Sequence, residues 1–280
     1  MSIFKTKTVK GGKNTEIEMD IFYLNQIPDA MEKMGWEMAP KLMRHWFDTK
    51  PASAFTEATK ELYAVIGDSV NIPKEKVNDS IVKMTWALNY TQVRELVEEL
   101  HSMWASPKGI LLLKKRLIKS KDKHIGYTDS AIELDTYAQV NSRKIGSMLD
   151  TIDDYYGAIG KATIKLAVRG HVERRNSKEV FITELVGIYL KDSYDFITKG
   201  EFLGVWHKNG VLNKTKTIAY MGLYEKNAWK ELAGEYSGTV PIYNDDFQMW
   251  QKKRNAGGDF IVFSDVLWMS PLPAHRIVEL

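Results

Sequence analysis

Residues 161–190 read KATIKLAVRGHVERRNSKEVFITELVGIYL, and this stretch decides the fold. In residues 161–172 apolar and polar side chains alternate, which is the period of a half-buried strand. Residues 179–190 are more apolar, and a polar turn at residues 175–177 separates the two segments. This pattern predicts an antiparallel hairpin. The first strand carries Ala162, Ile164, Leu166, Val168 and Val172 on one face, and Lys161, Thr163, Lys165, Arg169 and His171 on the other.

The sequence after the hairpin predicts further strands. Residues 202–206 and 218–224 are strand candidates, with a turn at Lys208, Asn209 and Gly210. Asp245 is expected to cap a short helix over residues 246–254, which Gly257 and Gly258 end before a strand at residues 260–263. The carboxy-terminal half is therefore predicted to be mainly antiparallel sheet.

The amino-terminal half has a helical period instead. From residue 27 to about residue 121, apolar side chains recur at spacings of three and four, most clearly in residues 91–104. Residues 31–47 form a second such surface, interrupted at Pro40, which indicates a short turn followed by a helix. Its methionines are either packed core or an adaptable face that binds a partner.

These patterns predict an α+β protein with a helical amino-terminal half, followed by a mainly antiparallel β-sheet or half-barrel. The expected domains are a helical domain over residues 1–124, a connecting region over 125–156 that includes a short helix at 145–152, and a β-rich catalytic domain over 157–280. Residues 109–123, GILLLKKRLIKSKDK, are either the solvated end of a helix or a surface that meets anionic lipid or phosphate.

Composition excludes several classes of protein. The 280 residues carry a net charge of +3 and contain no cysteine, which excludes disulfides, thiolate zinc sites and cysteine nucleophiles. So small an excess of basic residues gives no argument for nucleic-acid binding, and we expect none. The chain lacks a P-loop, a dinucleotide-binding glycine fingerprint, HExxH, an EF-hand loop and a GxSxG elbow. It also shows no signal-peptide pattern and no apolar stretch long enough to span a membrane.

Residues 191–196, KDSYDF, carry the strongest candidate site, because they follow the apolar strand at the predicted rim of the sheet. Asp192 and Asp195 are suited to activating water or to binding a metal, for which Mg²⁺ is the expected cofactor. His207, at the end of the next strand, is the candidate proton donor. Arg169 and His171 are candidates for a phosphate pocket. The alternative is that these are ordinary turn and packing residues.

Four segments carry a resemblance to a known family. They are IPDAMEKMGWEMAPKLMRHWF, ELVGIYLKDSYDF, FLGVW and GGDFIVFSDV, and together they resemble an uncharacterised bacterial family of unknown function. Its members are typically encoded beside type VI secretion components. The resemblance covers most of the chain and implies a context of antagonism between bacteria.

A second similarity is to the catalytic domain of colicin M, which hydrolyses lipid II between undecaprenol and pyrophosphate. Its Asp-x-Tyr-Asp motif is matched by Asp192, Tyr194 and Asp195, and the nearest analogue of the His-Arg pair that follows is His207 with Lys208. The similarity implies a β-rich half-barrel after a helical region. It also implies catalytic roles for Asp192, Tyr194, Asp195 and His207, and a substrate-binding role for Lys208 beside Arg169 and His171.

Two functions are therefore expected. The first is an antibacterial effector of type VI secretion that hydrolyses lipid II at the membrane surface. It would be cytoplasmic in its producer, leave by a route without a signal peptide, act in the target periplasm, and bind a spike or tube component and an immunity protein. The second is a non-enzymatic adaptor or chaperone that binds a secretion component or an effector through an exposed groove containing Met31, Met34, Met38 and Trp46.

Overall fold

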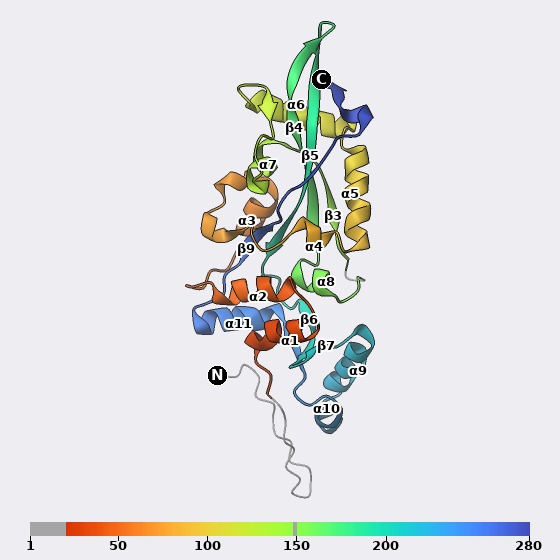
Figure 1. Ribbon diagram of the computed structural model, residues 1–280. Coiled ribbons are helices and arrows are strands. Elements are labelled where there is room, and N and C mark those ends of the chain that lie inside the picture. The colour runs from red at the N-terminus through yellow and green to blue at the C-terminus, as the bar shows by residue number, and fades with distance from the viewer. Residues whose placement is uncertain (1–20, 148–149) are drawn as a thin grey trace, which may run out of the picture. The chain divides into compact units, whose positions relative to one another are not determined.

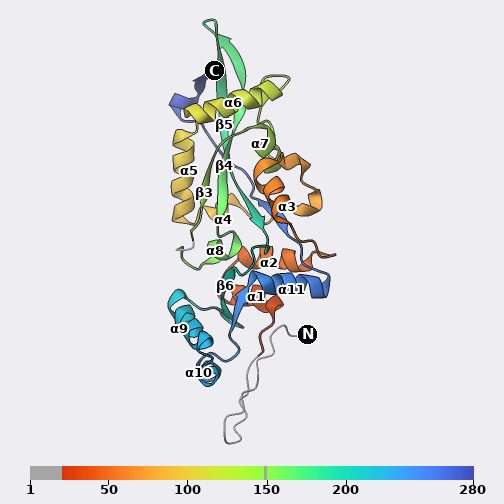
Figure 2. The same cartoon turned by 180° about the vertical axis from the view of Figure 1, so that it is seen from behind.

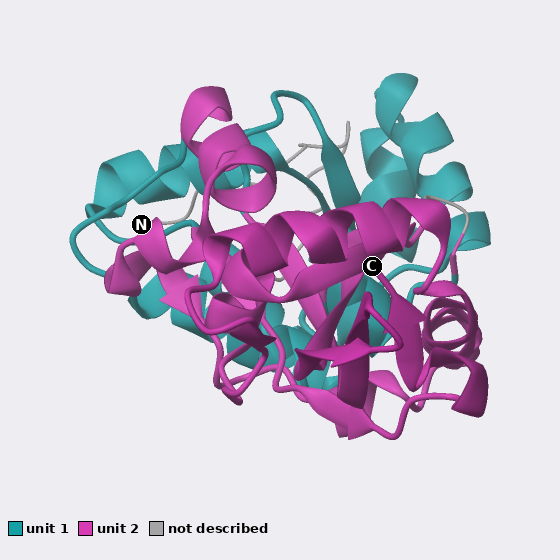
Figure 3. Cartoon of the chain, turned by 90° about the horizontal axis from the view of Figure 1, so that it is seen from above, with its two compact units in different colours: residues 1–55, 151–158, 195–259 teal, residues 56–150, 159–194, 260–280 magenta. Residues whose placement is uncertain are grey.

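The structure is a computed structural model that describes residues 21–147 and 150–280. Contacts divide the chain into two compact units, coloured separately in Figure 3. Unit 1 comprises Met1–Phe55, Thr151–Ala158 and Asp195–Asp259, and unit 2 comprises Thr56–Asp150, Ile159–Tyr194 and Phe260–Leu280. The units alternate along the chain, unlike the consecutive domains expected over 1–124, 125–156 and 157–280. The reason is that segments far apart in sequence pair in one sheet.

Unit 2 is built on the predicted hairpin, formed by β4 (Ala162–Arg175) and β5 (Lys178–Tyr194). Short strands pair along both of its edges (Figure 1). The free edge of β5 pairs in turn with β11 (Ile277–Glu279), β10 (Leu267–Met269) and β9 (Phe260–Phe263). The free edge of β4 pairs with β2 (His124–Ile125) and β3 (Gln139–Ile145). Among the named strands of the described residues, only β1 (Val77–Asn78) and β9 pair in parallel. The sheet is curled into a half-barrel, which confirms the α+β class.

The hairpin turn follows from its residues. Asn176 and Ser177 have φ of 48° and 67°, the left-handed values that a two-residue turn of type I′ requires. They bring Arg175 opposite Lys178 and so set the register of the strands. The predicted apolar face of β4 is confirmed at Ile164, Leu166 and Val168, which are fully buried.

Helices cover the sheet of unit 2 in both views of the chain (Figures 1 and 2). α5 (Thr91–Met103) confirms the helix expected over residues 91–104, and it contacts β3. α6 (Pro107–Lys119) contacts β2 and β3, and α7 (Ala131–Tyr137) contacts β3 and β4. The other helical segments are α3 (Glu57–Glu61), η2 (Leu62–Ile66), η3 (Ser69–Asn71), η4 (Lys74–Lys76), α4 (Met84–Ala87) and η5 (Pro273–His275).

Unit 1 combines helices with a small antiparallel sheet. Its strands are β6 (Phe202–His207), β7 (Gly210–Val211) and β8 (Val240–Tyr243), with β6 in the middle. Its helical segments are η1 (Leu24–Gln26), α1 (Ile27–Lys33), α2 (Ala39–Asp48), α8 (Asp154–Ala158), α9 (Lys214–Glu225), α10 (Trp229–Glu235) and α11 (Asn244–Arg254). The turn and helix expected around Pro40 and the strand expected at 202–206 are confirmed. The helix expected at 246–254 is also confirmed, but it begins at Asn244, and Tyr243 rather than Asp245 is at its cap position.

An aromatic cluster forms the core of unit 1. The ring of Trp46 lies 5.0 Å from Phe196 and 5.4 Å from Phe247 between centroids, and its Nε1 donates a 2.7 Å hydrogen bond to Asp259. Met31, Met38 and Trp46 are buried, so the helical methionine surface is core and the expected exposed groove is wrong. Met34 is half-buried, and its sulfur accepts from the backbone N–H of Val211.

Two predicted elements differ from the structure. Residues 218–224 lie in helix α9, because Asn213 caps it by accepting from the N–H of Lys216 and Tyr220 packs with Leu232. A short apolar run does not distinguish a strand from a helix. The helix expected at 145–152 includes residues 148–149, which lie outside the described residues, and Ile145 ends strand β3.

The stretch over residues 1–20, on which the absence of a signal peptide was inferred, also lies outside the described part of the chain. Over residues 21–147 and 150–280, no helix has both the length and the apolar character needed to cross a bilayer.

Candidate functional site

The first two predicted catalytic residues lie within β5 itself. The strand continues past Leu190, where it was expected to end, because β9 pairs with its last four residues. Asp192 lies opposite Val262 and Tyr194 opposite Phe260, so both side chains are on the same face of the strand. The predicted rim is therefore a paired strand end rather than a loop.

Tyr194 is a buried, neutral phenol. Its side chain is 8% exposed and stacks on Phe260 with ring centroids 5.1 Å apart. Burial, and then the charge of Asp192, raise the pKa of Tyr194 well above its ordinary value. The hydroxyl therefore keeps its proton and is able to donate a hydrogen bond, while Asp192, the residue two positions earlier on the same face, is half-buried.

The other catalytic candidates belong to unit 1. Asp195 is the first residue of its third segment, and His207 ends β6. Burial, and then the charge of Lys216, lower the pKa of His207, and its Nδ1 accepts from the N–H of Asn209 at 3.2 Å. This imidazole is therefore neutral at pH 7 and carries its proton on Nε2. The carbonyl of Lys208 accepts from Lys33 Nζ at 2.8 Å. The convergence of these residues with Asp192 and Tyr194 stays a prediction.

Arg169, a candidate for substrate binding, holds a loop onto the sheet of unit 2. Its Nε donates to the carbonyl of Gly126 at 2.9 Å, and its Nη2 donates at 3.0 Å to the carbonyl of Thr128 and to Asp129. The guanidinium also lies 4.1 Å from the ring centre of Trp268. A phosphate would have to displace Asp129 from this guanidinium, so the role of Arg169 in phosphate binding stays a prediction.

His171 lies between two carboxylates. Its Nδ1 is 3.0 Å from Glu184 and its Nε2 is 3.1 Å from Glu173, and the hydrogen bond with Glu173 is the largest of the effects that raise its pKa. Tyr127 donates to the same Glu184, and burial with this bond raises the pKa of Tyr127 to about 12. The surroundings of His171 are acidic, so they add no support to the prediction that it binds phosphate.

No group of three or more histidine, aspartate and glutamate side chains arranged to hold a metal occurs in residues 21–147 and 150–280. Mg²⁺ binding by Asp192 and Asp195 therefore stays a prediction that rests on two carboxylates. Magnesium is commonly held by one or two carboxylates together with substrate phosphates, so such a pair is compatible with it.

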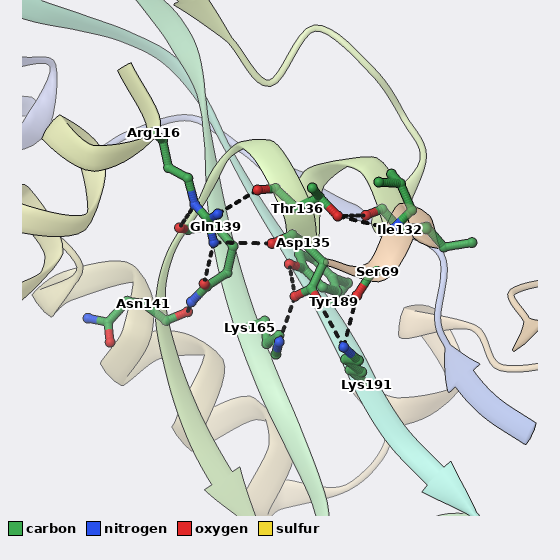
Figure 4. A network of polar contacts seen from close by, with 11 residues as sticks. Ser69, Arg116, Ile132, Asp135, Thr136, Gln139, Asn141, Lys165, Tyr189 and Lys191 are labelled. Carbon is green, nitrogen blue, oxygen red and sulfur yellow. Dashed lines mark hydrogen bonds and ion pairs between the residues drawn. The ribbon is translucent and has the colours of Figure 1, made fainter. Parts of the chain in front are cut away.

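A buried network of charged groups, which the sequence did not predict, lies in unit 2 (Figure 4). Asp135 of α7 forms ion pairs with Lys165 of β4 at 2.7 Å and with Lys191 of β5 at 3.0 Å. The same carboxylate accepts from the hydroxyl of Tyr189 at 2.9 Å and from that of Ser69 at 2.6 Å. Four separate segments of the chain therefore meet at one carboxylate.

The electrostatics of the network follow from burial. Burial by itself raises the pKa of Asp135, but Lys165 and Lys191 outweigh it and lower the pKa to about 2. Desolvation lowers the pKa of Lys191, which is buried more deeply than Lys165. Asp135 is therefore ionised throughout the physiological range, and its single negative charge is shared between the two ammonium groups beside it.

Ser69 and Lys191 have the residue types of a nucleophile and base pair, and Lys191 Nζ donates a hydrogen bond to Ser69 Oγ at 2.9 Å. Both side chains are buried, however, and the Ser69 hydroxyl donates a hydrogen bond to Asp135. The N–H of Val70 donates to Thr136 at 3.2 Å, which adds a second attachment between the same segments. As arranged, the network fastens η3 and α7 to the sheet.

Arg116 of α6 fixes the backbone of the last turn of α7 and of the residues just after it. Its guanidinium donates to the carbonyls of Thr136 and Gln139, and to that of Asp135 at 3.3 Å (Figure 4). One of the six basic residues predicted to form a solvated or anion-binding run therefore points inward. Its position in the sequence, between Lys115 and Leu117, gives no sign of this.

The described structure defines an α+β protein whose larger sheet is a half-barrel holding a buried aspartate between two lysines. The chain belongs to a family of unknown function (DUF6402), whose model matches residues 22–278. No curated protein and no solved structure matches the chain.

Proposed function

We propose that this chain is an antibacterial effector delivered by type VI secretion, and that it hydrolyses the pyrophosphate linkage of lipid II in the target periplasm. The observation that carries the proposal is the placement of Asp192 and Tyr194 on one face of β5, with Asp195 directly after the strand. A strand paired on one side by β9 is a rigid support, and rigid supports favour sites in which carboxylates must be held in place.

The proposed chemistry divides among the predicted residues. Asp192 or Asp195 accepts a proton from the attacking water. Tyr194 keeps its proton and orients a pyrophosphate oxygen by donating a hydrogen bond. The neutral His207 donates a hydrogen bond from Nε2 to the leaving oxygen, which takes its proton from solvent. Asp192 and Asp195 would hold Mg²⁺, whose positive charge would stabilise the pyrophosphate.

Expression in a sensitive bacterium tests the proposal. Wild type directed to the periplasm is expected to lyse the cells, and the purified protein to release pyrophosphoryl-linked product from lipid II. Asp195→Asn is expected to lose both activities with an unchanged melting temperature. Asp79→Asn, which changes an exposed carboxylate elsewhere in the described chain, is the matched control and is expected to keep both. Hydrolysis that persists in Asp195→Asn would exclude this site, and harmless periplasmic wild type would exclude an envelope target.

A second candidate function, an adaptor that binds a spike component or effector, is favoured by one observation. Leu62, Val65, Ile66 and Val70 are exposed aliphatic side chains on neighbouring turns of unit 2. An adaptor would be harmless in the periplasm, and Val65→Ser with Ile66→Ser would abolish its capture of the purified spike component. Equal capture by this variant would exclude the patch as the adaptor surface.

A further inference from the structure

The outward face of α6 has an unusual combination of side chains. At 3.6 residues per turn, Leu111 and Ile118 are seven residues apart and lie on one stripe of the helix. These two side chains are 54% and 84% exposed. The opposite stripe is buried and holds Gly109, Leu113 and Leu117. The outward stripe is therefore aliphatic at its centre although it faces solvent.

Lysines flank this stripe on both sides. With 100° between successive residues, Lys114 lies on one side of the stripe and Lys108, Lys115 and Lys119 lie on the other. All four are exposed, and none of the four forms an ion pair in the described parts of the chain. The sequence of α6, PKGILLLKKRLIK, contains no acidic residue. The face is therefore uniformly cationic around an aliphatic centre.

The orientation of this face is fixed. Leu113 and Leu117 are buried, and Arg116 donates to the carbonyls of Thr136 and Gln139 on the inner side. Ser106 caps the helix by accepting from the N–H of Gly109 at 3.3 Å. The helix therefore has little freedom to rotate and bury its aliphatic stripe.

We propose that this face of α6, centred on Leu111 and Ile118, binds the surface of a bilayer that contains anionic phospholipid. Aliphatic side chains at the centre enter the boundary between headgroups and acyl chains, and long lysine stems let the flanking ammonium groups reach the phosphates. A phosphate-tracking surface for nucleic acid has no use for an exposed aliphatic centre, so the bilayer fits better than a nucleic acid. The proposal does not rest on hydrolysis by the protein.

Cosedimentation with vesicles tests the proposal on the full chain. Wild type is expected to bind vesicles of phosphatidylcholine mixed with phosphatidylglycerol, to bind pure phosphatidylcholine weakly, and to lose binding as salt rises. Failure to bind the mixed vesicles at low salt would overturn the proposal.

Matched variants assign the binding to α6. Ile118→Ser is expected to weaken binding about tenfold, because one aliphatic side chain no longer enters the bilayer. Its control is Ile218→Ser on α9, where the side chain is 74% exposed, and this variant is expected to bind like wild type. Equal losses in the two variants would overturn the assignment.

The lysines have a matched control of the same kind. Lys115→Gln with Lys119→Gln is expected to weaken binding roughly twenty- to thirtyfold, at about fivefold for each basic residue near an anionic surface. Lys214→Gln with Lys216→Gln, at exposed positions on α9, is expected to have little effect. The opposite outcome has two parts: wild type binds duplex DNA tightly and the α6 lysine variant does not, and Ile118→Ser binds vesicles like wild type. That outcome would mean that the face recognises nucleic acid, and the proposal would be wrong.

The outcome is separable from that of the proposed hydrolysis. Asp195→Asn is expected to bind vesicles like wild type, whereas the α6 variants are expected to cleave detergent-solubilised lipid II normally. Loss of vesicle binding in Asp195→Asn would place the lipid contact at the candidate catalytic site and overturn the assignment to α6.

Discussion

Replacing Asp135 by asparagine is expected to destabilise unit 2 by about 3–5 kcal/mol, because removing one partner of a buried ion pair leaves an uncompensated charge. Asp135 lies 2.7 Å from Lys165 and 3.0 Å from Lys191, so the change leaves two ammonium groups with a neutral amide between them. The lowering of the Asp135 pKa from 3.8 to about 2 is itself equivalent to about 2 kcal/mol in favour of the ionised form. The loss is a large part of the 5–15 kcal/mol that stabilises a typical protein.

Hydrogen exchange read by mass spectrometry measures this loss within unit 2. Peptides from β4 and β5 are expected to exchange faster in Asp135→Asn, and peptides from α2 and α11 of unit 1 serve as an internal reference. The control is Asp129→Asn, which removes an exposed carboxylate from Arg169 and is expected to cost less than about 1 kcal/mol. Adding Lys191→Met to Asp135→Asn is expected to recover part of the loss, because one of the two uncompensated charges disappears.

The same carboxylate predicts a dependence on acid. Its pKa is lowered on folding, so its contribution is complete above about pH 4 and is lost as pH falls toward about 2. The difference in stability between wild type and Asp135→Asn is expected to shrink over that range by about 2 kcal/mol. Two results would show that Asp135 does not stabilise unit 2 through its charge. One is a loss of stability in Asp135→Asn at pH 7 no larger than that in Asp129→Asn. The other is a stability difference between wild type and Asp135→Asn that does not change below pH 4.

Three further outcomes are expected. Asp154→Ala removes the carboxylate that accepts from the N–H groups of residues 37–39 at the start of α2, and chemical denaturation of unit 1 should show a loss of roughly 1–2 kcal/mol. Ser177→Gly is expected to raise the stability of unit 2 by about 0.5–1 kcal/mol in the same assay, since φ of 67° costs glycine little; a loss would mean that the serine side chain stabilises the turn. NMR titration should give His171 a pKa above 6.5, and Glu184→Gln should lower that pKa. Because the pKa is raised on folding, the pairing of His171 stabilises the fold at low pH, and this contribution is lost as pH rises through the folded pKa. An unchanged titration in Glu184→Gln would exclude that contact in solution.

The elements that were predictable from sequence are those set by local pattern. The stripe of residues 91–104 and the alternation of residues 161–172 each determine one element, and α5 and β4 confirm them. The strand predicted at residues 218–224 is wrong because an apolar run of that length fits either a strand or a helix. The cap at Asn213 is what makes this segment part of helix α9. The end of β5 was misplaced because pairing with β9, about 70 residues further along the chain, extends it.

The buried network was not predictable because the local sequence around each of its charged residues indicates an exposed side chain. Lys165 lies on the face of β4 expected to meet solvent, and α7 covers that face. Lys191 directly follows the apolar strand and was expected to begin a loop. Asp135 is an ordinary polar residue of a short helix until Lys165 and Lys191 are brought to it. The sequence places a lysine in each of two adjacent strands, and once the strand register is known these two lysines indicate a nearby carboxylate.

The alternation of the two units along the chain has a consequence for the time course of synthesis. Unit 1 needs residues from before and after the first two segments of unit 2, since Trp46 packs on Phe247 and donates a hydrogen bond to Asp259. About 200 residues separate the end of its first segment from Asp259, so at 5–20 residues per second the first segment waits roughly 10–40 s on the ribosome for its partners. During this interval the tryptophan and the methionine of α2 lack their packing partners, and nascent chains are expected to need a chaperone then. A gene cut between the halves would yield neither unit.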